Sequence, residues 1–133
     1  MAEEISDRIL QQRIRNRILE SVELASSFEL QLGYERQVPA ITAWEVLERW
    51  DDWVRVHPRT APPHAVLSDR ERETLVLVAD AIEVATEALR PFDYPSMEQA
   101  QALPAWAALR DLAGSALEVL TERGFMSENM EDD

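Results

Sequence analysis

Glycine and proline, the residues that most often end helices, are absent from the first 32 positions of the chain. Strong helix formers fill the segment from Glu3 to Leu32, and this predicts one helix of about 30 residues and about 45 Å, closed by Gly33. Seven apolar side chains of this helix fall within one stripe and predict its packed face: Leu10, Ile14, Ile18, Val22, Ala25, Phe28 and Leu32. The chain therefore opens with a predicted helix more than twice the usual length.

Four further apolar residues of this segment lie on a different side of the predicted helix: Ile5, Ile9, Leu19 and Leu30. Exposing several large apolar side chains would forgo about 1.5–3 kcal/mol each. Such a helix either lies between layers of the domain or offers its second face to another subunit. We therefore predict a homodimer that buries these four residues.

Capping signals open the remaining helices, because a Ser or Thr side chain followed three residues later by Glu or Gln satisfies the free backbone N–H groups of a first turn. The predicted helices run from Thr42 to Val54, Ser68 to Leu89, Ser96 to Leu103, and Pro104 to Gly124. Together they predict an all-α fold, a compact bundle of four main helices plus one short helix. We expect one domain over residues 1–124 and a disordered acidic tail over residues 125–133.

Charge and composition exclude several classes of function. The 133 residues include 26 acidic and 13 basic residues, a formal net charge of −13. Such a surface repels phosphate backbones and anionic headgroups, so neither nucleic acid nor a membrane is an expected partner. Every basic residue is Arg and there is no Cys, which excludes Schiff-base lysines and thiolate metal sites. With no export signal or apolar run long enough to cross a bilayer, we expect a cytoplasmic protein.

The helix predicted after Thr42 combines an apolar arc with an acidic one. The inward arc contains Val46, Leu47, Trp50, Trp53 and Val54. Outward residues are Glu45, Glu48 and Asp52, and Trp44 lies at their edge beside Asp51. Carboxylates so close together repel one another, and a basic partner would relieve this repulsion. The pattern predicts a partner-binding surface, with Trp44 as its aromatic anchor.

Paired carboxylates suggest an alternative function. Glu20 with Glu23, and Glu45 with Glu48, share helix faces at i, i+3 spacing and could hold Mg²⁺ between two helices. This arrangement resembles the E-x-x-E … E-x-x-D pattern of all-α nucleotide pyrophosphohydrolases of the MazG type, although Glu48 stands where the pattern has Asp. The resemblance implies a Mg²⁺-dependent nucleotide hydrolase, and clustering of the four glutamates would favour it.

No other arrangement of residues predicts catalysis or a cofactor. Three glycines leave no phosphate-binding loop, and His57 and His64, seven residues apart in a proline-rich loop, are expected to be ordinary loop residues. The sequence thus favours a non-enzymatic module that binds a basic protein. Small acidic bacterial proteins that neutralise toxins are similar in composition, and a structural subunit of a larger assembly is a further alternative.

Overall fold

The computed structural model describes residues 5–62 and 64–132 and confirms an all-helical fold. Over these residues it contains six helices and no strand: α1 (Asp7–Ala25), α2 (Phe28–Gln37), α3 (Trp44–Trp53), α4 (Asp69–Leu89), α5 (Met97–Gln101) and α6 (Pro104–Thr121). None of these helices is both long and apolar enough to cross a membrane.

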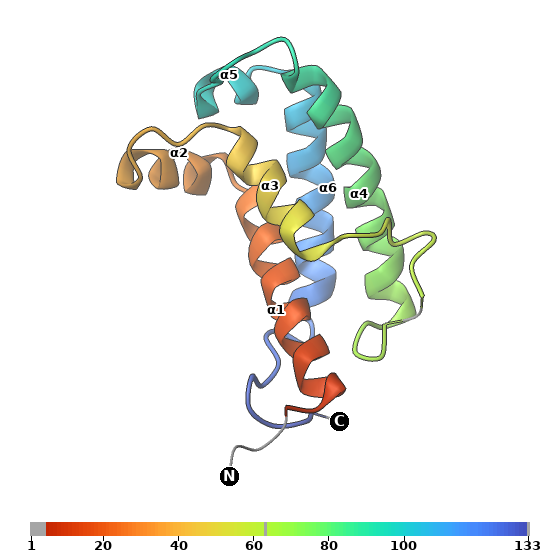
Figure 1. Cartoon of the computed structure of the whole chain (residues 1–133). Helices are drawn as coiled ribbons and strands as arrows, with labels where there is room; N and C mark the ends of the chain where they lie inside the picture. Colours follow the sequence, from red (N-terminus) through yellow and green to blue (C-terminus); the bar gives the residue numbers. More distant parts are fainter. Residues whose placement is uncertain (1–4, 63, 133) are drawn as a thin grey trace.

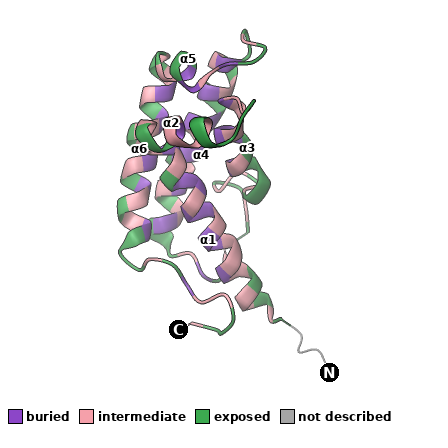
Figure 2. Ribbon diagram, turned by 90° about the vertical axis from the view of Figure 1, so that its left-hand side faces the viewer, coloured by how far each residue is buried: buried purple, intermediate pink, exposed green. Residues whose placement is uncertain are grey.

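Helices α1, α4 and α6 form the body of the molecule (Figure 1). Helix α6 packs along α4 and also against α1, while α3 covers the other side of α1. Helix α2 projects sideways at one end and contacts α5. Buried residues occur on all of these long helices (Figure 2). Those of the apolar core include Val22, Leu47, Leu75, Leu89, Trp106 and Leu120. One apolar core therefore joins elements from the whole chain.

The prediction of a single long first helix is wrong. Helix α1 ends at Ala25, and α2 begins at Phe28 after the N-cap Ser27, whose hydroxyl accepts a hydrogen bond from the Leu30 N–H at 3.1 Å. Gly33 consequently lies inside α2 and not at a helix end. The predicted start at Glu3 lies outside the described residues. A serine cap without a following Glu or Gln was enough to break the helix, which gives six helices where five were predicted.

Most of the other predicted helix starts are correct, and the predicted ends of α3, α5 and α6 lie one to three residues beyond the observed ones. Ser68 with Glu71 and Ser96 with Gln99 both form complete capping boxes, and Pro104 occupies the first turn of α6. Helix α3 differs, because its N-cap is Ala43 and Thr42 makes no cap. The Ala43 N–H instead donates to the Pro95 carbonyl at 2.8 Å, so a contact with the α4–α5 loop sets the start of α3.

Leu19 does not belong to a surface for self-association. Its side chain is only 1% exposed and belongs to the apolar core, and the helix that carries it packs against both α6 and α3. Ile9 is half-buried, while Ile5 and Leu30 are 46% and 47% exposed. The break after Ala25 places Leu30 on a separate helix. Self-association stays a prediction, and of the four residues only Ile5 and Leu30 offer largely exposed apolar surface to it.

Residues 125–132, predicted to be a disordered tail, lie against α1 and are hydrogen-bonded to it. Asn16 of α1 bonds both backbone groups of Met126, and Gln12 bonds the backbone of three further tail residues. The acidic composition of this segment gives no sign of these bonds from Gln12 and Asn16, because they are made to its backbone.

Two glycines of the last helical region should respond to substitution in opposite ways. A methyl group on Gly114, inside α6, would meet no atom within 4 Å, so Gly114→Ala is expected to raise the free energy of unfolding by about 0.5–1 kcal/mol. Gly124 has a φ of 72°, and Gly124→Ala is expected to lower it because Ala is strained there. Urea denaturation followed by circular dichroism measures both, and equal effects of the two changes would contradict the argument.

Candidate functional site: an acidic helix face and the groove beside it

Helix α3 is amphipathic, and its register determines which side chains reach the surface. Val46, Leu47 and Trp50 are buried in the core and fix the orientation of the helix. The opposite side carries Glu45, Glu48, Asp51 and Asp52, which we call the α3 acidic face. Glu48, Asp51 and Asp52 are exposed, and Glu45 is half-buried. The structure therefore brings together the four acidic residues that the sequence predicts as a partner-binding surface.

Within the described residues, Glu45 is the only member of the α3 acidic face whose carboxylate forms an ion pair, and Arg55 bonds only the backbone carbonyl of Asp52, at 3.3 Å. Glu45 lies 3.4 Å from the Nε of Arg49, and Arg49 also donates to the Tyr34 hydroxyl at 2.6 Å. Within residues 5–62 and 64–132, no ion pair involves Glu48, Asp51 or Asp52. Most of the negative charge of this face is thus left uncompensated.

Two carboxyl groups of the α3 acidic face have raised pKa values. Partial burial raises the pKa of Glu48 above its ordinary value, and the nearby carboxylates of Glu45, Asp52 and Asp51 raise it further. Partial burial and the neighbouring charge of Asp52 likewise raise the pKa of Asp51. Only the part of each increase that comes from the neighbouring carboxylates reflects repulsion between ionised groups. A bound cation would lower both pKa values.

The two tryptophans at the ends of α3 are arranged differently from the prediction. Trp53, predicted to face inward, is 44% exposed. It follows Glu45 and Arg49 at spacings of i+8 and i+4, so it ends a row that runs beside the acidic face. Trp44 is half-buried and packs against the core. Trp53 is therefore the aromatic side chain of α3 that offers the larger surface to a partner.

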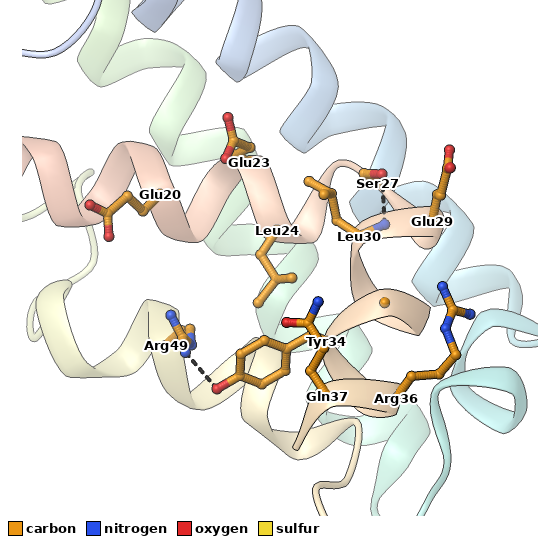
Figure 3. Close-up of a pocket in the computed structure, with 11 residues that line it drawn as sticks. Glu20, Glu23, Leu24, Ser27, Glu29, Leu30, Tyr34, Arg36, Gln37 and Arg49 are labelled. Carbon is orange, nitrogen blue, oxygen red and sulfur yellow. Dashed lines mark hydrogen bonds between the residues drawn. The ribbon is translucent and has the colours of Figure 1, made fainter. Parts of the chain in front are cut away.

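A groove of about 720 Å³ lies between α1, α2 and α3, next to the acidic face. Its principal side chains are Glu20, Glu23, Leu30, Tyr34, Arg36 and Arg49 (Figure 3). Arg49 stacks on the Tyr34 ring, with its guanidinium carbon 4.8 Å from the ring centroid, and Figure 3 shows Glu23 pointing away from this pair. Glu20 pairs with Arg17 at 3.3 Å. The groove thus combines exposed apolar surface with carboxylates.

The glutamates of the alternative prediction do not form one site. Glu20 and Glu23 line the groove, whereas Glu45 and Glu48 belong to the outer side of α3. Within the described part of the chain, no group of three or more His, Asp or Glu side chains is placed to hold a metal ion. The clustering that would favour a MazG-type hydrolase is therefore not found.

His57 and His64 bond to other residues and not to each other. The Nδ1 of His57 accepts the Arg59 N–H, and its Nε2 lies 2.9 Å from Asp80 of α4. Bonds from both His57 and Arg59 hold the pKa of Asp80 below its ordinary value. His64 lines an apolar pocket of about 250 Å³ under the loop, where burial lowers its pKa. Both residues shape the loop.

A buried ionic cluster, which the sequence does not predict, joins three helical regions. Arg15 is fully buried and donates to Glu71 at 2.6 Å and to the Gly124 carbonyl at 2.5 Å. Arg123 also donates to Glu71 and, at 2.6 Å, to the Val66 carbonyl. Only the capping role of Glu71 is visible in the sequence, because its partners are 56 and 52 residues away. We call Arg15, Glu71 and Arg123 the ionic cluster.

Comparison with known proteins adds no further site. No protein-family model, no curated protein and no solved structure matches this chain.

Proposed function

We propose that the chain is a non-enzymatic protein-binding module whose α3 acidic face docks a basic protein partner. The observation that carries this proposal is the absence, over the described residues, of any ion pair to the carboxylates of Glu48, Asp51 and Asp52, although all three lie exposed on one short helix. A partner that supplies Lys or Arg side chains here would remove repulsion and add attraction at the same time.

Apolar surface beside the acidic face would add affinity to this electrostatic attraction. Charge complementarity mainly speeds the encounter, whereas packed aromatic and aliphatic side chains slow dissociation. Trp53 at one end of α3 and Leu30 in the adjoining groove are exposed and can supply such contacts. The proposed interface therefore extends from α3 into the groove.

The whole molecule also favours a basic partner, since its net charge of −13 attracts cations from all directions. A basic toxin that is neutralised when this module covers its surface is the kind of partner that fits. We propose such an immunity-type role as the specific form of the binding function.

Charge reversal on α3 tests this proposal. Immobilised wild-type chain, Glu48→Arg and Glu83→Arg are exposed in parallel to a lysate of the source cells, and retained proteins are identified by mass spectrometry. Glu83 is an exposed glutamate of α4, so it controls for the change in net charge. We expect a basic protein on the wild-type and Glu83→Arg columns, with association to Glu48→Arg about ten-fold slower.

Salt and pH give independent checks with the purified partner. Affinity should fall as salt rises, because the interacting charges are exposed. Since cation binding would lower the raised pKa values of Glu48 and Asp51, affinity should also fall as the pH drops through their titration range. A partner that binds all three columns equally and ignores salt would show that this face is only solvated surface.

A further inference from the structure

Two amide side chains of α1 bind the backbone of the C-terminal segment as a receptor binds a peptide. Asn16 accepts from the Met126 N–H and donates to the Met126 carbonyl, both at 2.8 Å. Gln12 donates to the carbonyls of Ser127 and Met130 at 2.8 and 2.7 Å and accepts the Asp132 N–H at 2.7 Å. Both amides are buried beneath the segment. Five hydrogen bonds thus hold the segment through groups that every residue type has.

Charged groups beside these amides select an acidic segment. Arg17 and the Asn16 amide both bond the Glu128 carboxylate, and Arg13 donates to the Glu128 carbonyl at 2.7 Å. Arg8 donates to the Asp132 carbonyl at 2.8 Å. These arginines belong to the most basic stretch of an acidic chain. The face therefore matches a peptide with a carboxylate at the position of Glu128.

The bound segment keeps its own turn. The Ser127 N–H donates to the Asp132 carboxylate at 2.7 Å, and the Ser127 hydroxyl accepts from Asn129 and Met130. A segment that is already folded loses little conformational freedom when it binds. Residues 126–132 can consequently leave and bind as one unit.

The joint between α6 and this segment allows release. Arg123 is fixed by Glu71 and Val66, and the next residue, Gly124, is held by Arg15 and the Leu120 carbonyl. The joint therefore lies after Gly124, at Phe125, whose side chain is largely exposed. Within the segment, Met126 is the one buried apolar side chain. Because the other contacts are polar, water can replace them on release, at less cost than exposing an apolar face.

We propose that the α1 face formed by Gln12, Arg13, Asn16 and Arg17 is a binding site for an acidic turn peptide, and that residues 126–132 of a second copy of this chain can fill it. The exchanged segment makes the same contacts as it makes within one chain, which is why exchange of an identical element is a low-cost route to dimers. The proposal is independent of the partner proposed for α3.

Energy transfer between two labelled populations of the full chain tests the exchange. The chain has no Cys, so Met130→Cys carries a donor in one population and Leu10→Cys an acceptor in the other, both at exposed side chains. The populations are mixed at about 1 mM, because a tethered segment competes with an effective concentration on the order of millimolar. We expect transfer to appear on mixing and to vanish on dilution.

Matched variants show whether the transfer comes from this face. Gln12→Ala with Asn16→Ala in both populations should reduce transfer about five-fold or more. Gln11→Ala should leave the transfer unchanged, since the side-chain oxygen of Gln11, Oε1, has no hydrogen-bond partner. Met126→Pro, which lies outside every helix and removes the N–H bonded to Asn16, should also reduce it. Absence of transfer at 1 mM, or transfer that survives both changes in chains with normal circular dichroism, would overturn the proposal.

Discussion

Replacing Arg15 with Met is expected to lower the free energy of unfolding by about 3–5 kcal/mol, because it removes one partner of a buried ion pair. Arg15 is 0% exposed and Glu71 only 2%, so water cannot replace the lost guanidinium. The change also leaves the Gly124 carbonyl without its donor, whereas the Leu120 carbonyl keeps the bond from the Gly124 N–H at 3.0 Å. Urea denaturation followed by circular dichroism measures the loss.

A second substitution and a surface control separate the buried charge from general damage. Arg15→Met combined with Glu71→Gln is expected to be more stable than Arg15→Met alone, because no poorly compensated carboxylate remains buried. Arg70→Met removes an exposed arginine that pairs with Glu122 at 2.6 Å, and it should cost no more than about 1 kcal/mol. A double variant no more stable than Arg15→Met would refute this explanation.

The ionic cluster also predicts the direction of the pH dependence. Burial alone would raise the pKa of Glu71, but hydrogen bonds from Arg123, Arg15 and the Ser68 N–H together hold it below its ordinary value. The stabilisation is therefore fully present above the pKa of Glu71 in the unfolded chain, and it is lost as the pH falls through the lower, folded value. Glu71→Gln should flatten the acid limb of the stability profile.

Replacing Gln31 with Leu is expected to lower the free energy of unfolding by about 3 kcal/mol or more, because each buried polar group left without a partner costs about 1–3 kcal/mol. Gln31 is fully buried in α2. It donates to the Leu24 and Ala25 carbonyls at the end of α1, and accepts from the Trp106 indole at 2.9 Å and the Gln101 amide at 3.1 Å. One side chain thus joins α1, α2, α5 and α6.

The control for Gln31 lies on the same helix. Gln37 is exposed at the end of α2, and Gln37→Leu should change stability by no more than about 0.5 kcal/mol. Both variants are compared by urea denaturation. A Gln31→Leu protein as stable as Gln37→Leu would mean that the amide bonds do not hold α2 in place.

Local signals in the sequence predicted where most of the helices start. The capping boxes at Ser68 and Ser96 and the proline at position 104 act within one turn, so their effect depends little on the rest of the fold. Ser27 acts locally too, but a lone serine is common within helices. The sequence therefore gave too weak a signal to predict the break between α1 and α2.

Contacts between distant residues explain the remaining errors. Leu19 and Trp53 were assigned to faces from helical periodicity alone, and the true faces depend on where α1 ends and on how α3 packs against it. Asn16 and Gln12 show no special pattern, because their partners lie more than 100 residues away. The acidic residues of α3 could be placed because the apolar periodicity of that short helix is regular.

The contact between α1 and residues 126–132 can form only at the end of synthesis, because its two sides are far apart in the sequence. Arg8 and the Asp132 carbonyl that it binds are 124 positions apart, so a ribosome that adds 5–20 residues each second needs about 6–25 s to supply the second after the first. During that interval the face of α1 that binds residues 126–132 is exposed to water. Because this face consists of amides and guanidinium groups and not of apolar side chains, water can cover it, and it adds no apolar surface to the unfinished chain.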